Sequence, residues 1–250
     1  MVRISTYIVT FIICIVSLIS GHSQEVIDVA HFDKVIISPH IQVKFIEGNR
    51  ESVVIENSKL AREKINIENE GKTLRVYLDG AKMITKNVKA DHSKWNNQRK
   101  SLYKGTQVTA IVYYKDIKEL SIRGEEVILC ESPMKSDDFK LKIYGESKII
   151  MNSLEAESFQ VSMYGESYLE IKDGVVGTQK YTVYGEGEVN SLGLNNENTK
   201  ITAYGEGNFR INVSDNLKVT AYGEANVAYN GDPSINKGII IGKARIQKMN

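Results

Sequence analysis

Apolar and polar residues alternate with a period of two in long runs through the second half of the chain. An amphipathic helix would need apolar residues at spacings of three and four, so the alternation predicts β-strands with one buried and one exposed face. Residues 25–80 and 108–120 alternate in the same way, in shorter segments separated by turn residues such as Glu47-Gly48-Asn49. The pattern therefore predicts an all-β protein.

The tripeptide Tyr-Gly-Glu recurs along these runs. Its five copies have glycine spacings of 20, 20, 20 and 18 residues, and Arg123-Gly124-Glu125 is a degenerate copy before them. Positions two and four residues to either side of each glycine carry apolar or small side chains. Each repeat is too short for a strand–helix–strand unit. The repeat predicts a right-handed parallel β-helix, or β-solenoid, with about 20 residues per turn.

In such a coil the glycine and the small residue two positions later are expected where the chain bends, facing the interior. A larger side chain there would collide with its copies above and below. Neighbouring turns lie about 4.8 Å apart, so identical outward residues form ladders. We expect two ladders and take them as candidate ligand-binding residues: Tyr144, Tyr164, Tyr184, Tyr204 and Tyr222, with Glu146, Glu166, Glu186, Glu206 and Glu224 beside them.

The tyrosine ladder has two interpretations. Aromatic neighbours in adjacent strands stabilise a sheet by roughly 0.2–1 kcal/mol per pair, so the ladder could serve only to hold the register. Tyrosines with acids beside them also suit a carbohydrate or a surface protein, through apolar ring faces and hydrogen-bonding edges. Residues 141–230 carry 7 basic and 12 acidic residues, a formal charge of −5, which adds an acidic character to this surface.

The glutamate ladder needs an explanation, because like charges opposite one another destabilise a sheet. Solvent screening, raised carboxyl pKa values or a bound cation would each offset the repulsion. A linear ladder lacks the converging carbonyls of a calcium loop, so we expect no metal ligands and no cofactor. The histidines outside the leader, His31, His40 and His92, show no metal-ligand spacing.

Catalysis and nucleic-acid binding are both disfavoured. The chain has 32 basic and 31 acidic residues, so no overall charge favours nucleic acid. Residues 82–104 hold seven basic residues and one acid, which we interpret as a solvated loop, with Trp95 keeping a binding role open. Carboxylates repeated without variation are typical of a scaffold, so we expect no catalytic residues. An enzyme that cleaves polysaccharides with glutamates as acid and base is the least favoured alternative.

The N-terminus predicts export. Residues 1–23 contain Arg3 and then an apolar run at 7–19, which is typical of a signal peptide; an uncleaved anchor is the alternative, although the run is shorter than the roughly 20 residues that span a bilayer. No second apolar run follows, so no transmembrane segment is expected after cleavage. Cys14 leaves with the leader, and Cys130 remains as a single core cysteine, without an intramolecular disulfide. We expect a periplasmic, outer-membrane-associated or extracellular protein.

The chain also resembles a known family in the order and spacing of several short motifs. They are Phe32-Asp33-Lys34-Val35, Tyr113-Tyr114-Lys115-Asp116-Ile117-Lys118-Glu119-Leu120, Gly185-Glu186-Gly187, Gly205-Glu206-Gly207 and Tyr229-Asn230-Gly231-Asp232-Pro233. In these it is similar to the putative auto-transporter adhesin, head GIN domain family. The resemblance implies an exported bacterial β-helical protein of the cell envelope, with a role in adhesion and no catalytic residues to carry over. The regular Tyr and Glu and the basic stretch depart from the usual pattern.

The expected organisation is a leader at 1–23, a strand-rich part at 24–120 that includes the basic loop, and β-helix repeats with a C-terminal cap at 121–250. Residues 238–246 are the expected cap, because exposed solenoid ends pair easily with other chains. The expected function is non-catalytic binding or adhesion at the envelope. A structural or assembly protein of the envelope, able to form a homo-oligomer, is the main alternative.

Overall fold

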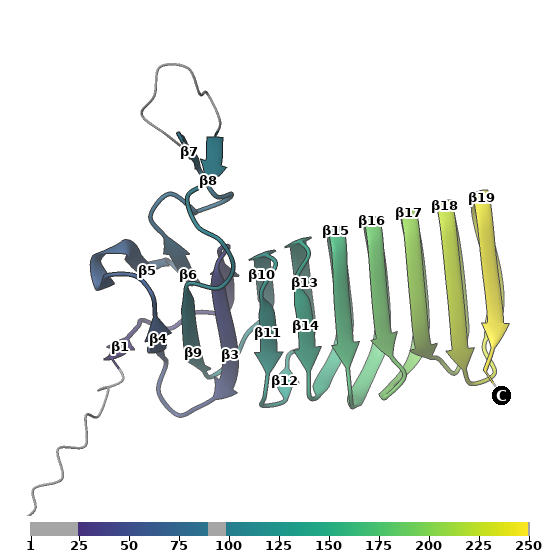
Figure 1. Ribbon diagram of the computed structural model, residues 1–250. Helices are drawn as coiled ribbons and strands as arrows, with labels where there is room; N and C mark the ends of the chain where they lie inside the picture. Colours follow the sequence, from purple (N-terminus) through teal and green to yellow (C-terminus); the bar gives the residue numbers. More distant parts are fainter. Residues whose placement is uncertain (1–24, 90–98, 250) are drawn as a thin grey trace, which may run out of the picture.

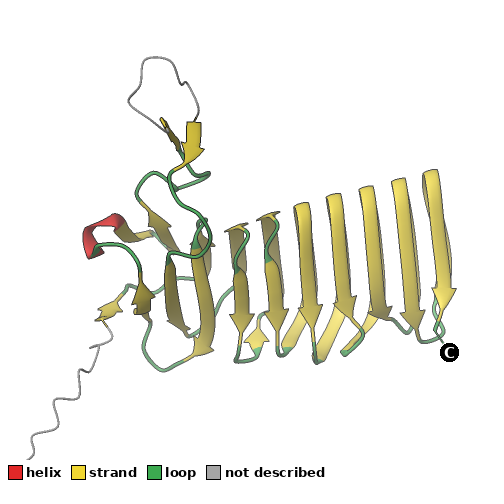
Figure 2. Ribbon diagram, in the orientation of Figure 1, coloured by secondary structure: helices red, strands yellow, loops and turns green. Residues whose placement is uncertain are grey.

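The computed structural model describes residues 25–89 and 99–249. The expected signal peptide at 1–23 and the residues His92 and Trp95 lie outside this range. Strands make up most of the described chain, and its one helical segment is the short 3₁₀ helix η1 (Arg62–Lys64) (Figures 1 and 2). Within the described ranges, no helix has the length and apolar character that crossing a membrane requires.

The Tyr-Gly-Glu repeats form a coil of parallel strands, which confirms the β-solenoid prediction. Successive turns pair in register with a 20-residue offset, as in Gly165 with Gly185, and the offset falls to 18 between Gly205 and Gly223. Figure 1 shows the long strands standing side by side along the solenoid. These turns are built from β13 (Asp138–Gly145), β14 (Lys148–Met151), β15 (Leu154–Ile171), β16 (Gly174–Ser191), β17 (Leu194–Asn212), β18 (Asn216–Asn230) and β19 (Ser234–Lys248).

The strand-rich N-terminal part joins the same sheet. Strands β2 and β3 pair in parallel with β10 and β11, which in turn pair with β13 and β14, so β2 and β3 continue the stack of turns. Antiparallel pairs β1–β4, β4–β9 and β5–β6 complete this end. The strands are β1 (Glu25–Asp28), β2 (Lys34–Ile37), β3 (Ile41–Glu47), β4 (Ser52–Ser58), β5 (Ile65–Glu70), β6 (Thr73–Leu78), β9 (Val108–Tyr114), β10 (Glu119–Gly124), β11 (Val127–Cys130) and β12 (Met134–Lys135).

One continuous core runs through both parts, because the inward positions of successive turns stack on one another. A representative column of partners across the sheet is at most 2% exposed: Leu74, Val35, Leu120, Leu141, Val161, Tyr181, Ile201 and Val219. Cys130 is fully buried in the same core, as expected. The alternation in the sequence thus marks which side chains face inward.

The repeated glycine sits at a bend that only glycine adopts without strain. Its φ lies between +106° and +135° in all six copies, a backbone region that residues with a Cβ avoid. A Cβ at Gly205 would lie 2.5 Å from the carbonyl oxygen of Gly185 in the turn before. The expected clash is therefore with the neighbouring backbone rather than with stacked side chains. At the small position two residues later, the Ser147 and Ser167 hydroxyls donate hydrogen bonds to the glycine carbonyls of the preceding turn, at 2.8 and 2.9 Å.

The basic stretch at 82–104, expected to be a loop, contains regular structure in its described residues, 82–89 and 99–104. Its described residues include strands β7 (Asn87–Lys89) and β8 (Arg99–Ser101), which pair as an antiparallel ribbon. The ribbon stands apart from the main sheet in Figure 1. Before it, residues 80–86 approach the solenoid: the Ser38 hydroxyl donates to the carbonyl of Lys82, at 2.7 Å.

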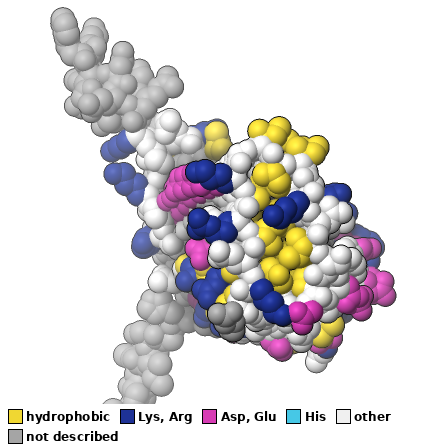
Figure 3. Space-filling model, turned by 90° about the vertical axis from the view of Figure 1, so that its right-hand side faces the viewer, with side chains coloured by type: hydrophobic (Ala, Val, Ile, Leu, Met, Phe, Trp, Pro, Cys, Tyr) yellow, Lys and Arg dark blue, Asp and Glu magenta, His cyan; other side chains and the backbone are white. Residues whose placement is uncertain are grey.

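The segment that we expected to cap the solenoid is its last described turn, β19, which covers β18. Ile235, Ile239 and Ile241 are exposed there. Viewed from this end, hydrophobic side chains lie in the middle of the face, with lysine and arginine side chains among them (Figure 3). Strand β19 carries four basic residues and no acid, and such charges oppose pairing between two copies of the same edge.

Candidate ligand-binding surface

The five predicted tyrosines form one continuous stack. Partners in the strand register are Tyr144, Tyr164, Tyr184, Tyr204 and Tyr222 in order. Neighbouring ring centroids are 4.8–5.0 Å apart, with interplanar angles of 2–4°. The spacing equals the distance between parallel strands, so the sheet itself sets the stacking distance. The ladder that the repeat predicts is confirmed.

Stacking changes what the ladder can offer to a ligand. Because the rings lie face to face, Tyr164, Tyr184 and Tyr204 have both faces covered by neighbours and are 38–40% exposed. The Arg123 guanidinium covers the outer face of Tyr144, 4.7 Å from the ring centroid, and Tyr222 is followed in register by Ile241. The expected contact through apolar ring faces is therefore wrong for this ladder, which presents ring edges and hydroxyls.

The hydroxyls of the ladder are hydrogen-bonding groups at neutral pH. Burial raises the pKa of Tyr164, and the flanking Tyr144 and Tyr184 raise it further, against a smaller lowering by Lys142. A phenol whose pKa lies above 10 stays protonated under physiological conditions. Each such hydroxyl can donate one hydrogen bond and accept others.

The glutamates form a second, exposed column beside the tyrosines. Glu166, Glu186 and Glu206 are direct register partners, and all five predicted glutamates are exposed. Exposure lets solvent screen the repulsion between them. At the end of the column Glu224 forms an ion pair with Lys243, at 3.3 Å. The sequence predicted the column, and the structure shows that its carboxylates are exposed and that Lys243 pairs with the last of them.

A shallow groove of about 310 Å³ follows the glutamate column. Glu146, Glu166 and Glu186 line one side, and the outward residues two positions later line the other. Its floor contains the small residues Ser147, Ser167 and Gly187. The tyrosine column runs along the neighbouring outward positions, so hydroxyls and carboxylates lie in adjacent parallel rows. The sequence predicted the rows but not the groove, which depends on the bend at each glycine.

The turn that precedes Tyr144 in the chain departs from the repeat in two columns. Arg123 stands in the tyrosine column, and Glu126 stands at the inward position that holds Ser147 in the next turn. Glu126 is buried. The degenerate copy was visible in the sequence, whereas the burial of Glu126 and its neighbours from distant segments were not.

Three potential metal-ligating side chains meet outside the repeats. His31 Nδ1 lies 3.0 Å from Glu51 Oε1 and 4.0 Å from Asp116 Oδ1, in segments far apart in the sequence. The Phe32 N–H also points to Glu51 Oε1, at 3.4 Å. These contacts satisfy the buried Glu51 carboxylate. Sequence spacing could not reveal the cluster, because the fold brings its three members together.

The coil of parallel strands and the aligned tyrosine and glutamate columns make this chain a β-solenoid protein with an extended, repetitive surface. The family model described as putative auto-transporter adhesin, head GIN domain, matches residues 31–233, and the chain belongs to this family. The resemblance found in the sequence motifs is thereby confirmed.

Solved structures share this fold at low sequence identity. A putative adhesin from Bacteroides fragilis NCTC 9343 has a TM-score of 0.72 at 15% identity, over 90% of this chain and 96% of the other. A putative adhesin from Parabacteroides merdae ATCC 43184 has a TM-score of 0.64 at 19% identity, over 91% and 96%. A protein described as a putative lipid binding protein, from Parabacteroides distasonis ATCC 8503, has a TM-score of 0.58 at 19% identity, over 91% and 96%. Among curated proteins, none matches this chain.

Proposed function

We propose that the protein is an exported, non-catalytic binding module of the bacterial cell envelope that holds its ligand along the tyrosine and glutamate columns. The observation that carries the proposal is the pair of adjacent rows, one of hydroxyls and one of carboxylates, beside a groove of about 310 Å³. Membership of an adhesin family and the signal-peptide pattern at residues 1–23 support the location.

The chemistry of the rows favours a ligand with many hydroxyl groups, such as a carbohydrate chain. The covered ring faces leave hydrogen bonding as the main contact, and a carboxylate can accept two hydrogen bonds from neighbouring hydroxyls. A ligand with a regular repeat would meet the same pair of groups at each turn. A surface protein is the alternative partner with the same hydrogen-bonding requirement.

The repetition of the carboxylates supports binding rather than catalysis. Acid–base catalysis by two carboxyl groups needs environments that set their pKa values apart. Here Glu166, Glu186 and Glu206 occupy equivalent exposed positions in successive turns. Equivalent carboxylates suit an extended contact surface.

A glycan array tests the proposal with a variant that separates binding from stability. The Tyr184→Phe/Tyr204→Phe double variant of the chain from Gln24 keeps the ring stack and removes two hydroxyls. We expect the wild-type chain to bind one class of glycan and the double variant to lose at least tenfold in affinity. Thermal unfolding of the two proteins should agree closely, because the stacked rings remain.

The matched control is Tyr113→Phe, which removes the hydroxyl of a partly exposed tyrosine outside the ladder. It should bind like the wild type. Equal binding by the double variant and the wild type would exclude the ladder as the contact surface. An array without any hit would favour a protein partner or a structural role in the envelope.

A further inference from the structure

A pocket lies at the start of the tyrosine ladder, between the first solenoid turns and the segment before the β7–β8 ribbon. Its volume is about 370 Å³, within the roughly 300–1,000 Å³ typical of small-molecule sites. Pro39, His40, Met83, Ile84 and Thr85 line one wall. The other wall holds Arg123, Gly124, Glu125, Glu126, Tyr144, Gly145 and Glu146.

Glu126 is a buried carboxylate at a position where the repeat places a small residue. Its side chain is 4% exposed, whereas Ser147, Ser167 and Gly187 take the same place in the next turns. Its Oε2 accepts one hydrogen bond from the Glu125 N–H, at 3.1 Å. Burying a carboxylate costs free energy that a serine at this position would avoid. Packing of the solenoid therefore does not explain Glu126.

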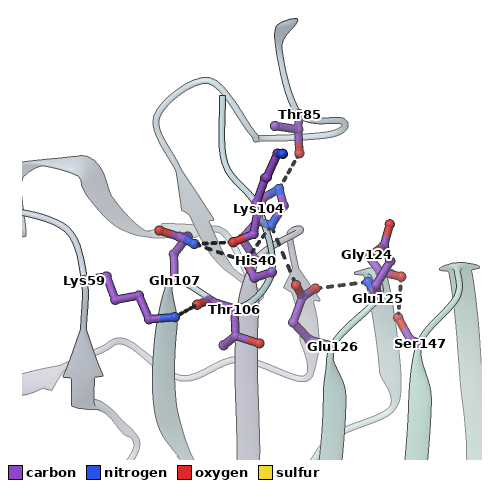
Figure 4. Close-up of polar contacts among 11 residues, drawn as sticks. His40, Lys59, Thr85, Lys104, Thr106, Gln107, Gly124, Glu125, Glu126 and Ser147 are labelled. Atoms are coloured by element: carbon purple, nitrogen blue, oxygen red, sulfur yellow. Dashed lines mark hydrogen bonds and ion pairs between the residues drawn. The ribbon is translucent and has the colours of Figure 1, made fainter. Parts of the chain in front are cut away.

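His40 faces the second oxygen of the Glu126 carboxylate, Oε1, and its own backbone is strained. It is the one non-glycine residue in the described ranges with a positive φ, 72°, a state that costs of order 1–3 kcal/mol and is concentrated at functional sites. Its Nδ1 donates to the Gly105 carbonyl at 3.0 Å and lies 3.7 Å from Glu126 Oε1. The Thr85 hydroxyl lies 2.6 Å from its Nε2 (Figure 4). The imidazole is thus fixed beside the buried carboxylate.

Arg123 lines the pocket and has a hydrogen-bond donor without a partner in the described part of the chain. Its guanidinium stacks on Tyr144, and its buried Nε finds no hydrogen-bond partner among the described residues. A guanidinium presents several donors in a planar fork that suits adjacent oxygen atoms. Opposite to these polar groups, Met83 and Ile84 are 50% and 80% exposed. The pocket therefore combines paired donors and acceptors with an apolar wall, as the two sides of a sugar ring require.

The charged residues of the lining further restrict the class of sugar that the pocket would bind. The lining holds one basic residue, Arg123, and three acidic residues, Glu125, Glu126 and Glu146. Acidic residues thus outnumber Arg123 in the lining, which disfavours an acidic sugar and favours one that bears an amine. Glu146 also lines the groove beside the ladder, so the pocket and the groove adjoin at this residue.

We propose that this pocket binds the end of a saccharide chain that carries no acid group, while the rest of the chain lies in the groove. The proposal rests on the function proposed above and adds where the chain ends and which sugars are excluded. Arg123 and the carboxylates hold the hydroxyls of the terminal sugar, and Met83 and Ile84 pack on its apolar side.

Calorimetric titration with three tetrasaccharides tests the proposal: a chitosan oligomer with free amines, the N-acetylated chitin oligomer and an oligogalacturonide. We expect the affinity to fall in that order, with the anionic oligomer at least tenfold weaker than the neutral one. The Arg123→Tyr/Glu126→Ser variant gives the first turn the residues of the second, so it should fold, and we expect a loss of at least tenfold for the first two oligomers. Glu126→Gln should reduce the preference for the amine, while Glu157→Gln, an exposed charge change away from the pocket, should not.

The outcomes separate this proposal from the proposed function. Undiminished binding by the Arg123→Tyr/Glu126→Ser variant, together with loss in the Tyr184→Phe/Tyr204→Phe variant, would overturn the pocket and leave the ladder standing. Loss in the first variant alone would support the pocket and contradict the ladder. Tight binding of the oligogalacturonide, or no binding of any of the three oligomers, would also overturn the pocket proposal.

Discussion

Replacing the repeated glycine Gly205 by alanine should destabilise the solenoid far more than replacing Gly187, which stands at the inward small position of the preceding turn. At Gly205, φ is +119°, and a Cβ would lie 2.5 Å from the carbonyl oxygen of Gly185. The disfavoured backbone region alone costs roughly 1–3 kcal/mol. The carbonyl belongs to the neighbouring strand and can move only by disturbing the ladder of hydrogen bonds. We therefore expect Gly205→Ala to lower the free energy of unfolding by about 3 kcal/mol or more.

Gly187→Ala is the matched control. Its Cβ would meet side-chain atoms, Val183 Cγ1 at 2.7 Å and Met163 Cε at 3.5 Å, and Ala225 already occupies the equivalent position two turns later. Side chains can shift, so we expect a loss of about 1 kcal/mol, at the low end for an overpacked core. Both variants change glycine to alanine, so the effect on the unfolded chain cancels between them.

Urea unfolding followed by circular dichroism measures the difference. With an m-value of about 3 kcal/mol/M, a difference of about 2 kcal/mol separates the two midpoints by about 0.7 M. Turns interact chiefly with their neighbours, so the loss arises at the contact between the turns of Gly185 and Gly205. Two variants that agree within about 0.5 kcal/mol, the ordinary effect of a surface substitution, would refute this account of the glycine.

Two further predictions concern titratable groups. Burial alone would raise the pKa of Glu119, but hydrogen bonds from Lys142 and Lys34 outweigh it and lower the pKa. As pH falls, the carboxyl of Glu119 takes up its proton in the unfolded chain before it does so in the folded one. The stability that the ionised carboxylate contributes is therefore present at neutral pH and is lost as pH falls through the lowered pKa. Glu119→Gln should be less stable than the wild type at pH 7, and its stability should decline less between about pH 5 and 3 in acid unfolding. Burial raises the pKa of the Cys130 thiol to about 12, so Ellman's reagent at pH 8 should label it only after unfolding.

Acid unfolding and thiol labelling each have an outcome that would contradict these two predictions. Parallel declines of Glu119→Gln and the wild type in acid would show that the Lys34 and Lys142 contacts do not couple to folding. Glu157→Gln, which removes an exposed carboxylate elsewhere on the solenoid, is the control for loss of a surface anion. Rapid labelling of Cys130 in the folded chain would show that the core around it opens readily.

Much of the fold can be predicted from the sequence, because a repeat of short strands can bury its apolar positions in only a few ways. The period of two marks the inward column at Leu141, Val161 and Ile201, and the 20-residue spacing places Tyr164 beside Tyr184. In a parallel solenoid, residues one turn apart become neighbours, so sequence spacing translates directly into contact. The ladders could be predicted for this reason.

Only the tertiary structure decided what the ladders expose. The strand spacing brings the tyrosine rings face to face, so their hydroxyls and edges, rather than their faces, meet the solvent. The sequence alone could not reveal this, because it depends on side-chain orientation at each bend. The ordered ribbon within the basic stretch likewise lacked a periodic signal long enough to predict it.

The pocket at the first turn and the His31 cluster arise from residues that the repeat does not relate. His40, Thr85 and Glu126 come from three segments, and no spacing in the sequence connects them. The sequence by itself determined the coil, its inward face and its columns, since these follow from local periodicity. The tertiary structure decided which irregular residues meet, because contacts between distant, non-repeating segments depend on how the chain packs as a whole.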